Sequence, residues 1–98
     1  LARVYVGTPN GYTVSVPEGW ASQPAINNKG IVFQQPGSTG NRNMVRIMEP
    51  GADPQYPNGY MRYYNSEGQP INPRTGKPDT NANTHVPFDY TGPLLGYP

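Results

Sequence analysis

The chain has no cysteine, a single histidine and only two lysines among its 98 residues. Without cysteine it can form neither a disulfide framework nor a thiolate metal site. The one histidine and the three dispersed aspartates form no cluster of metal ligands, so we expect neither a metal nor a cofactor. Charged residues make up 13% of the chain and the net charge is +1, so the sequence predicts no broad basic surface for non-specific nucleic-acid binding.

Long uninterrupted segments are also missing. The 13 prolines and 12 glycines leave no stretch free of both that is longer than residues 41–49. Because proline breaks a helix interior and glycine weakens it, bundles, coiled coils and membrane-spanning helices are excluded, and we expect no membrane partner. Eight tyrosines, two phenylalanines and one tryptophan argue against charge-driven disorder. We therefore predict one small, mainly β domain over residues 1–98, with a twisted antiparallel sheet of about four to six strands, long Pro/Gly-rich loops and little helix.

Apolar residues alternate with polar ones in several segments, as they do in strands. The predicted strands are a hairpin over residues 3–16 and separate strands over 30–35, 44–49 and 59–65, with a short extended piece over 84–88. Residues 20–28 instead allow one helical turn, because Pro24 can occupy a first helical position. The segment after residue 65 is otherwise dominated by turn residues.

The period of two places particular polar side chains on one open face of the sheet. If the apolar residues of its strand face the core, Arg46 must point to the opposite face. The same argument places Arg62 on that face, flanked by Tyr60 and Tyr64. Because neighbouring like charges repel and guanidinium groups bind phosphate through two hydrogen bonds, this arginine pair predicts a phosphate site. The alternative is that each arginine pairs on a solvated face with a carbonyl, Glu49 or Glu67.

His85 is the side chain best suited to take and give a proton at neutral pH, since imidazole titrates near ~6.5. A lone histidine is often structural or merely exposed, and that interpretation stays open. The only lysines, Lys29 and Lys77, lie in predicted loops, where each can either contact phosphate or be solvated.

Five short motifs follow one another in the second half of the chain. In order, they are Val45-Arg46-Ile47-Met48, Tyr56-Pro57-Asn58-Gly59-Tyr60-Met61-Arg62-Tyr63-Tyr64-Asn65, Gly68-Gln69-Pro70, Thr75-Gly76-Lys77 and Thr84-His85-Val86-Pro87. Their order resembles the ending of bacterial polymorphic toxins, which are short C-terminal effector domains of large exported proteins used in competition between bacteria. The resemblance covers residues 17–98, and it lies in the order of the motifs, since no single motif is distinctive.

Many such toxins are ribonucleases that resemble barnase, RelE and the colicin tRNases, in which an antiparallel sheet presents Arg, His and hydroxyl side chains. The resemblance implies that His85 is the general acid or base and that Arg46 and Arg62 hold the scissile phosphate, with Thr84 assisting. The expected substrate-binding residues are Lys29, Lys77 and two tyrosines that stack a splayed base, Tyr60 and Tyr64. Barnase-like enzymes often also have a catalytic glutamate and an N-terminal helix. Here the nearest carboxylate, Glu49, has core-facing parity, and no helix precedes the sheet.

The resemblance also implies a biological setting. The chain would be the C-terminal toxin module of a longer protein that is secreted or exported for contact-dependent inhibition, and Leu1 at its start fits a module cut from a longer chain. It would be a monomer when free, act in the cytoplasm of the target cell and be blocked by a cognate immunity protein.

We therefore expect a metal-independent endoribonuclease whose substrate RNA is cleaved by attack of its own 2′-hydroxyl. Two alternatives remain open. The richness in Tyr, Asn and Gly also suits a non-catalytic, β-rich protein-binding module. A toxin with other chemistry, such as degradation of a nucleotide cofactor, is the second.

Overall fold

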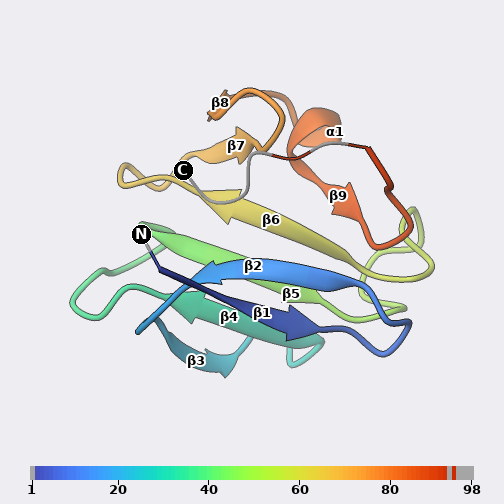
Figure 1. The fold of residues 1–98 in the computed structure, drawn as a ribbon, viewed down its shortest axis with the longest axis horizontal. Coiled ribbons are helices and arrows are strands. Elements are labelled where there is room, and N and C mark those ends of the chain that lie inside the picture. Colours follow the sequence, from blue (N-terminus) through green and yellow to red (C-terminus); the bar gives the residue numbers. More distant parts are fainter. Residues whose placement is uncertain (1, 93, 95–98) are drawn as a thin grey trace.

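Antiparallel strands build the molecule, which confirms the prediction of a mainly β domain (Figure 1). The computed structural model describes residues 2–92 and residue 94. Within this part of the chain, nine strands form a two-stranded hairpin and a seven-stranded sheet, and one four-residue turn is helical. The elements are β1 (Arg3–Gly7), β2 (Thr13–Pro17), β3 (Ala21–Pro24), β4 (Gly30–Gln34), β5 (Met44–Met48), β6 (Tyr60–Tyr64), β7 (Pro70–Asn72), β8 (Lys77–Pro78), α1 (Asn81–Thr84) and β9 (Val86–Pro87).

The large sheet has the order β3-β4-β5-β6-β7-β8, and β9 also pairs with β6. Both β7 and β9 pair with β6, at opposite ends of that strand: β7 pairs with Tyr63 and Tyr64, and β9 pairs with Tyr60 and Met61. The β6–β9 pairing brings a segment more than 20 residues further along the chain back to the start of β6. His85 directly precedes β9, so this pairing also determines where the only histidine lies.

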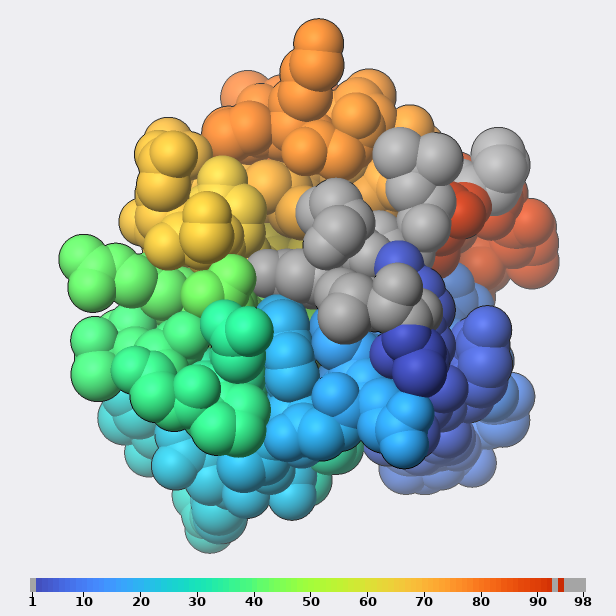
Figure 2. Space-filling view, turned by 60° about the vertical axis from the view of Figure 1, so that its left-hand side comes forward, coloured from blue at the N-terminus to red at the C-terminus, as the bar shows by residue number. Residues whose placement is uncertain are grey.

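The β1–β2 hairpin lies against one face of the large sheet and forms the main core with it (Figure 1). Figure 2 shows the blue atoms of the hairpin beside the cyan and green atoms of β3, β4 and the β4–β5 loop. The buried apolar residues at this interface come from β2, β5, β6, β7, β9 and the residue that follows β9, and they are Val14, Val16, Val45, Ile47, Met61, Tyr63, Ile71, Val86 and Phe88. Because side chains alternate along a strand, the remaining residues of β5 and β6 face away from the hairpin.

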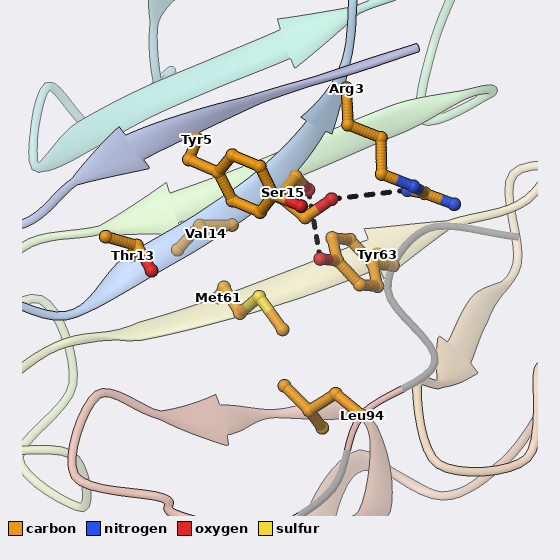
Figure 3. A pocket seen from close by; sticks show the side chains of 8 residues that line it. All are labelled: Arg3, Tyr5, Thr13, Val14, Ser15, Met61, Tyr63 and Leu94. Carbon is orange, nitrogen blue, oxygen red and sulfur yellow. Dashed lines mark hydrogen bonds between the residues drawn. The ribbon is translucent and has the colours of Figure 1, made fainter. Parts of the chain in front are cut away.

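Polar contacts hold the hairpin to β6 at one end of this core (Figure 3). The Tyr63 hydroxyl donates to the Ser15 carbonyl oxygen at 3.0 Å, and Arg3 donates to the Ser15 hydroxyl at 3.3 Å. Burial raises the pKa of Tyr63 far above its usual range, so the phenol remains a neutral donor. A hollow of about 260 Å³ lies beside these groups, between the hairpin and β6. Since Arg3 and Tyr63 both bind Ser15 and so join the hairpin to β6, we assign this region a structural role.

Two features differ from the sequence prediction. The helical turn expected over residues 20–28 is wrong: residues 21–24 form β3, which pairs with the otherwise free edge of β4. The sheet also has more strands than expected, and the additional ones, β3, β7 and β8, are short and contain proline. Each proline lies at a sheet edge or at a strand end, where its missing N–H removes no hydrogen bond between strands. The predicted domain includes residues 1, 93 and 95–98, which lie outside the described residues.

Two glycines of the β5–β6 loop give a matched test of the packing. Gly59 and Gly51 have similar φ angles, +90° and +91°. A Cβ at Gly59 would overlap the Met48 carbonyl oxygen and the Phe88 ring, whereas at Gly51 nothing lies within 4 Å. We expect Gly51→Ala to lower the free energy of unfolding by about 1–2 kcal/mol, the cost of a positive φ angle for alanine. Gly59→Ala should lower it by a further ~1–3 kcal/mol because of the overlap. Urea denaturation measures both free energies of unfolding, and equal losses would contradict this packing.

Candidate functional site

Both predicted arginines lie on the face of the large sheet that points away from the hairpin. Arg46 of β5 and Arg62 of β6 are direct cross-strand partners. The Cβ atoms of directly opposite residues lie about 4.5–5.5 Å apart, so the pairing of the two strands makes the two positively charged side chains neighbours. The Tyr64 ring lies beside both guanidinium carbons, at 5.7 Å from that of Arg46 and 5.6 Å from that of Arg62. The ring stabilises both cations without removing their charge.

This face is largely covered, whereas the sequence predicted an open one. The tyrosines Tyr60 and Tyr64 are buried, together with neighbouring residues from β4, β5 and the β3–β4 turn: Ala25, Val32, Met44 and Met48. The β5–β6 loop folds over the face and packs Ala52 and Tyr56 against it. The two arginines are partly buried and lie beside this second, smaller apolar cluster, where charges interact more strongly than in open solvent.

Among residues 2–92 and 94, the hydrogen-bond acceptors of Arg62 are all neutral oxygen atoms. Its Nε and Nη2 both donate to the Thr84 hydroxyl at 3.2 Å, and its Nη2 also donates to the Asn81 side-chain oxygen at 2.6 Å. Its Nη1 donates to the Tyr64 hydroxyl at 3.4 Å. Thr84 is fully buried, so this acceptor is fixed in place. These contacts orient the guanidinium group and include no carboxylate, while Asp53 lines a hollow together with Arg62 without bonding to it.

Arg46 has a buried Nε atom with no hydrogen-bond partner within the described residues. In the same part of the chain, neither arginine forms a salt bridge. Glu49 and Glu67, the carboxylates considered as partners, are exposed residues of the loops that follow β5 and β6. Glu49 directly follows β5 and lines a hollow together with Ile47 and residues of the hairpin, so it lies on the side that its parity predicted, although it is exposed and not buried in the core.

His85 lies beside this pair, at the start of β6. Its ring stacks on Tyr56 with a centroid distance of 5.3 Å and an interplanar angle of 5°, and it meets the Tyr60 ring at 4.8 Å. Its Nδ1 lies 2.7 Å from the main-chain oxygen of Asn81. A carbonyl can only accept, so Nδ1 carries the hydrogen and, in the neutral ring, Nε2 has a free lone pair.

The surroundings of His85 favour its neutral form. Burial lowers the pKa of His85 most strongly, and the nearby charges of Arg62 and Arg46 lower it further. The hydrogen bond to Asn81 and the charge of Asp53 act in the opposite direction, but the pKa of His85 still lies below its usual value. At neutral pH the imidazole can therefore accept a proton at Nε2.

A hollow of about 480 Å³ opens between the β5–β6 loop and α1. Its lining consists of Asp53, Gln55, Tyr56, Arg62, Asn81, Ala82 and His85. Sequence reasoning found Arg62 and His85 but missed the residues of the loop and of α1. Asn81 precedes Thr84 and His85 by three and four residues, the spacing of neighbours on a helical turn, and this signal was available in the sequence.

The structure thus brings together Arg46, Arg62, Tyr60, Tyr64, Thr84 and His85. The burial of both tyrosines corrects their expected role: they have no open ring face for a base, and they support the charged groups instead. The two lysines do not line the hollow. Lys29 is exposed in the β3–β4 turn, and Lys77 is exposed in β8, two strands away from β6.

Comparison of the chain with protein-family models, with curated proteins and with solved structures gives no match. Over residues 2–92 and 94, no helix is long and apolar enough to cross a membrane. In that same part, no group of three or more His, Cys, Asp or Glu side chains is placed to hold a metal ion, and the absence of a metal remains a prediction.

The titration of His85 tests this geometry. We expect an NMR titration to give a pKa below ~6.5, and Arg46→Gln to raise it by removing a nearby positive charge. Because the folded-state pKa is lowered, protonation of His85 opposes folding, and this contribution to stability is lost as the pH falls from ~6.5 through the folded-state value. The exposed Arg42 supplies the control, since Arg42→Gln removes the same charge elsewhere. A pKa of 6.5 or above would contradict the described burial.

Proposed function

We propose that this chain is the toxin domain of an exported bacterial protein and that it cleaves RNA as a metal-independent endoribonuclease. One observation carries the proposal: two adjacent arginines, which have no salt bridge to a carboxylate among the described residues, lie beside a histidine whose Nε2 can accept a proton. An RNA phosphodiester supplies the missing negative charge, and its 2′-hydroxyl supplies the proton and the nucleophile.

Each chemical step has a group suited to it. His85 Nε2 takes the 2′-hydroxyl proton, the 2′-oxygen forms a bond to phosphorus, and the bond from phosphorus to the 5′-oxygen breaks. The leaving 5′-oxygen takes a proton from water in the hollow. Arg46 and Arg62 stabilise the charge that grows on the phosphoryl oxygens, which is usually the largest catalytic term of this kind. The products are a 2′,3′-cyclic phosphate and a 5′-hydroxyl, and no electron transfer or co-reactant is required.

RNA binding in this proposal is local. With a net charge of +1, the chain offers the phosphate backbone little attraction beyond the arginine pair. Tyr56 is half-buried at the hollow and stacks on His85, so its ring is the one placed to contact a base next to the scissile phosphate. Stacking of this kind contributes about 1–3 kcal/mol per base.

The setting follows from the order of the motifs in the sequence. The domain would be a monomer when free and would act on RNA in the cytoplasm of a target cell. A cognate immunity protein would protect the producing bacterium by covering the hollow between the β5–β6 loop and α1.

A cleavage assay in EDTA tests the proposal. We expect the purified domain to cut RNA into fragments with 2′,3′-cyclic phosphate and 5′-hydroxyl ends. His85→Ala should lower the rate by about 10²–10⁴-fold, because the proton acceptor is lost. Arg46→Gln should lower it by about 10²–10³-fold, because one charge on the phosphate is lost. Arg42→Gln removes an equal charge from an exposed loop and is expected to change the rate little.

Intact RNA, or cleavage that His85→Ala leaves unchanged, would refute the ribonuclease proposal. Expression in bacterial cytoplasm then separates the alternatives. Growth arrest without RNA cleavage would indicate a toxin with other chemistry, such as degradation of a nucleotide cofactor. Harmless expression would favour a non-catalytic binding module.

A further inference from the structure

Asn81 contacts both chemical groups of the site, through two different oxygen atoms. Its side-chain oxygen accepts a hydrogen bond from Arg62 Nη2 at 2.6 Å. Its main-chain oxygen accepts from His85 Nδ1 at 2.7 Å and from the His85 amide at 3.2 Å. The same main-chain oxygen also accepts from the Thr84 hydroxyl, which in turn binds Arg62. One residue of α1 therefore fixes the orientation of an arginine and the tautomer of a histidine.

The position of Asn81 is itself fixed by the neighbouring carboxylate. Asp79 accepts from the Thr80 amide at 2.7 Å, from Asn83 Nδ2 at 3.2 Å and from Asn72 Nδ2 at 3.1 Å. Asn72 is buried in β7, so these bonds attach α1 to the sheet. The Asp79 carboxylate is thereby used to anchor α1 and makes no salt bridge with Arg62 within the described residues.

The neutrality of the Asn81 side chain matters because an aspartate at the same position would have the same shape. A carboxylate there would form a charge-assisted bond with Arg62 and compensate the charge that an anion must meet. It would also place a negative charge next to the phosphate, which disfavours binding. All described acceptors of Arg62 are neutral, so no directly bonded carboxylate reduces its charge, and Asp53 is a separate carboxylate in the lining of the hollow.

We propose that Asn81 is a positioning residue that orients Arg62 without cancelling its charge and holds His85 with its hydrogen on Nδ1. The inference rests on the proposed function in one respect, since it takes RNA phosphate as the anion that the site binds. Binding of an anion by the arginine pair is nevertheless measurable without any cleavage.

Asn81→Asp is the decisive variant, with inorganic phosphate as the probe. We expect the dissociation constant for phosphate, measured by calorimetry, to rise at least ~10-fold, while the melting temperature stays equal or rises because a salt bridge has formed. KM for RNA should rise more than kcat falls. The ascending limb of the pH–rate profile should move to higher pH, since an added negative charge stabilises protonated His85, while the charges of Asp53, Arg46 and Arg62 are unchanged.

Two further variants separate charge from structure. Asn81→Ala removes the side-chain acceptor without adding a charge, so its effect on phosphate binding should be smaller than that of Asn81→Asp. Asn41→Asp adds the same charge to an exposed loop and should bind phosphate like the unmodified protein. A merely structural Asn81 predicts the reverse order, with Asn81→Ala worse than Asn81→Asp, and that order would overturn the proposal.

The tautomer is tested on the unmodified protein, so this test does not depend on the folding of any variant. Imidazole nitrogen chemical shifts above the pKa should show the hydrogen on Nδ1, and a hydrogen on Nε2 would overturn the assignment. The two proposals fail separately. Weakened phosphate binding in Asn81→Asp without RNA cleavage would refute the ribonuclease and keep the role of Asn81. If the unmodified protein cleaves RNA and Asn81→Asp leaves KM unchanged, the ribonuclease proposal stands and the role of Asn81 is refuted.

Discussion

The register of β5 against β6 is the constraint on which the site depends. It makes Arg46 and Arg62 direct cross-strand partners, and the hairpin core leaves no other choice. Val45 and Tyr63 are fully buried beneath the hairpin, so a slip by one residue would turn the arginines into that core and the apolar residues out of it. The energy of the main core is thereby used to hold two like charges side by side.

On the face of the large sheet that points away from the hairpin, neighbouring side chains hold both arginines in place without a salt bridge among the described residues. Tyr64 contacts both guanidinium groups, while Thr84 and Asn81 give Arg62 neutral acceptors. Arg46 retains a buried Nε atom without a partner in the described part of the chain. Two like charges beside an apolar cluster cost folding stability unless they are paired, and under the proposed function the RNA phosphate supplies the partner. The hollow between the β5–β6 loop and α1 is lined by Arg62 and His85, and its lining does not include Arg46.

How much the sequence could predict differs between parts of the site. The alternation of apolar residues placed Arg46 and Arg62 on the correct face. One face of their strands is buried under the hairpin, and this burial fixes which side chains point to each side of the sheet. The location of His85 depends on the long-range pairing of β9 with β6, which no local pattern shows. Tyr56 lies on an irregular loop and Asn81 on a helix of one turn, where hydrophobic periodicity carries no signal. The strand at 21–24 was missed because Pro24 suits a helix start as well as an edge strand.

The most direct test of the central claim is the stability of Arg46→Met in the absence of any anion other than chloride at low concentration. Methionine suits the site because Met44 and Met48 lie on the same face of β5. If the two positive charges repel each other without a counter-charge, the free energy of unfolding of Arg46→Met from urea denaturation should exceed that of the unmodified protein by about 0.2–1 kcal/mol. Added salt should reduce this difference between the two proteins, because it screens the repulsion. A loss of stability in Arg46→Met at low ionic strength would contradict the account, because it would show that Arg46 stabilises the fold and that its charge is already balanced.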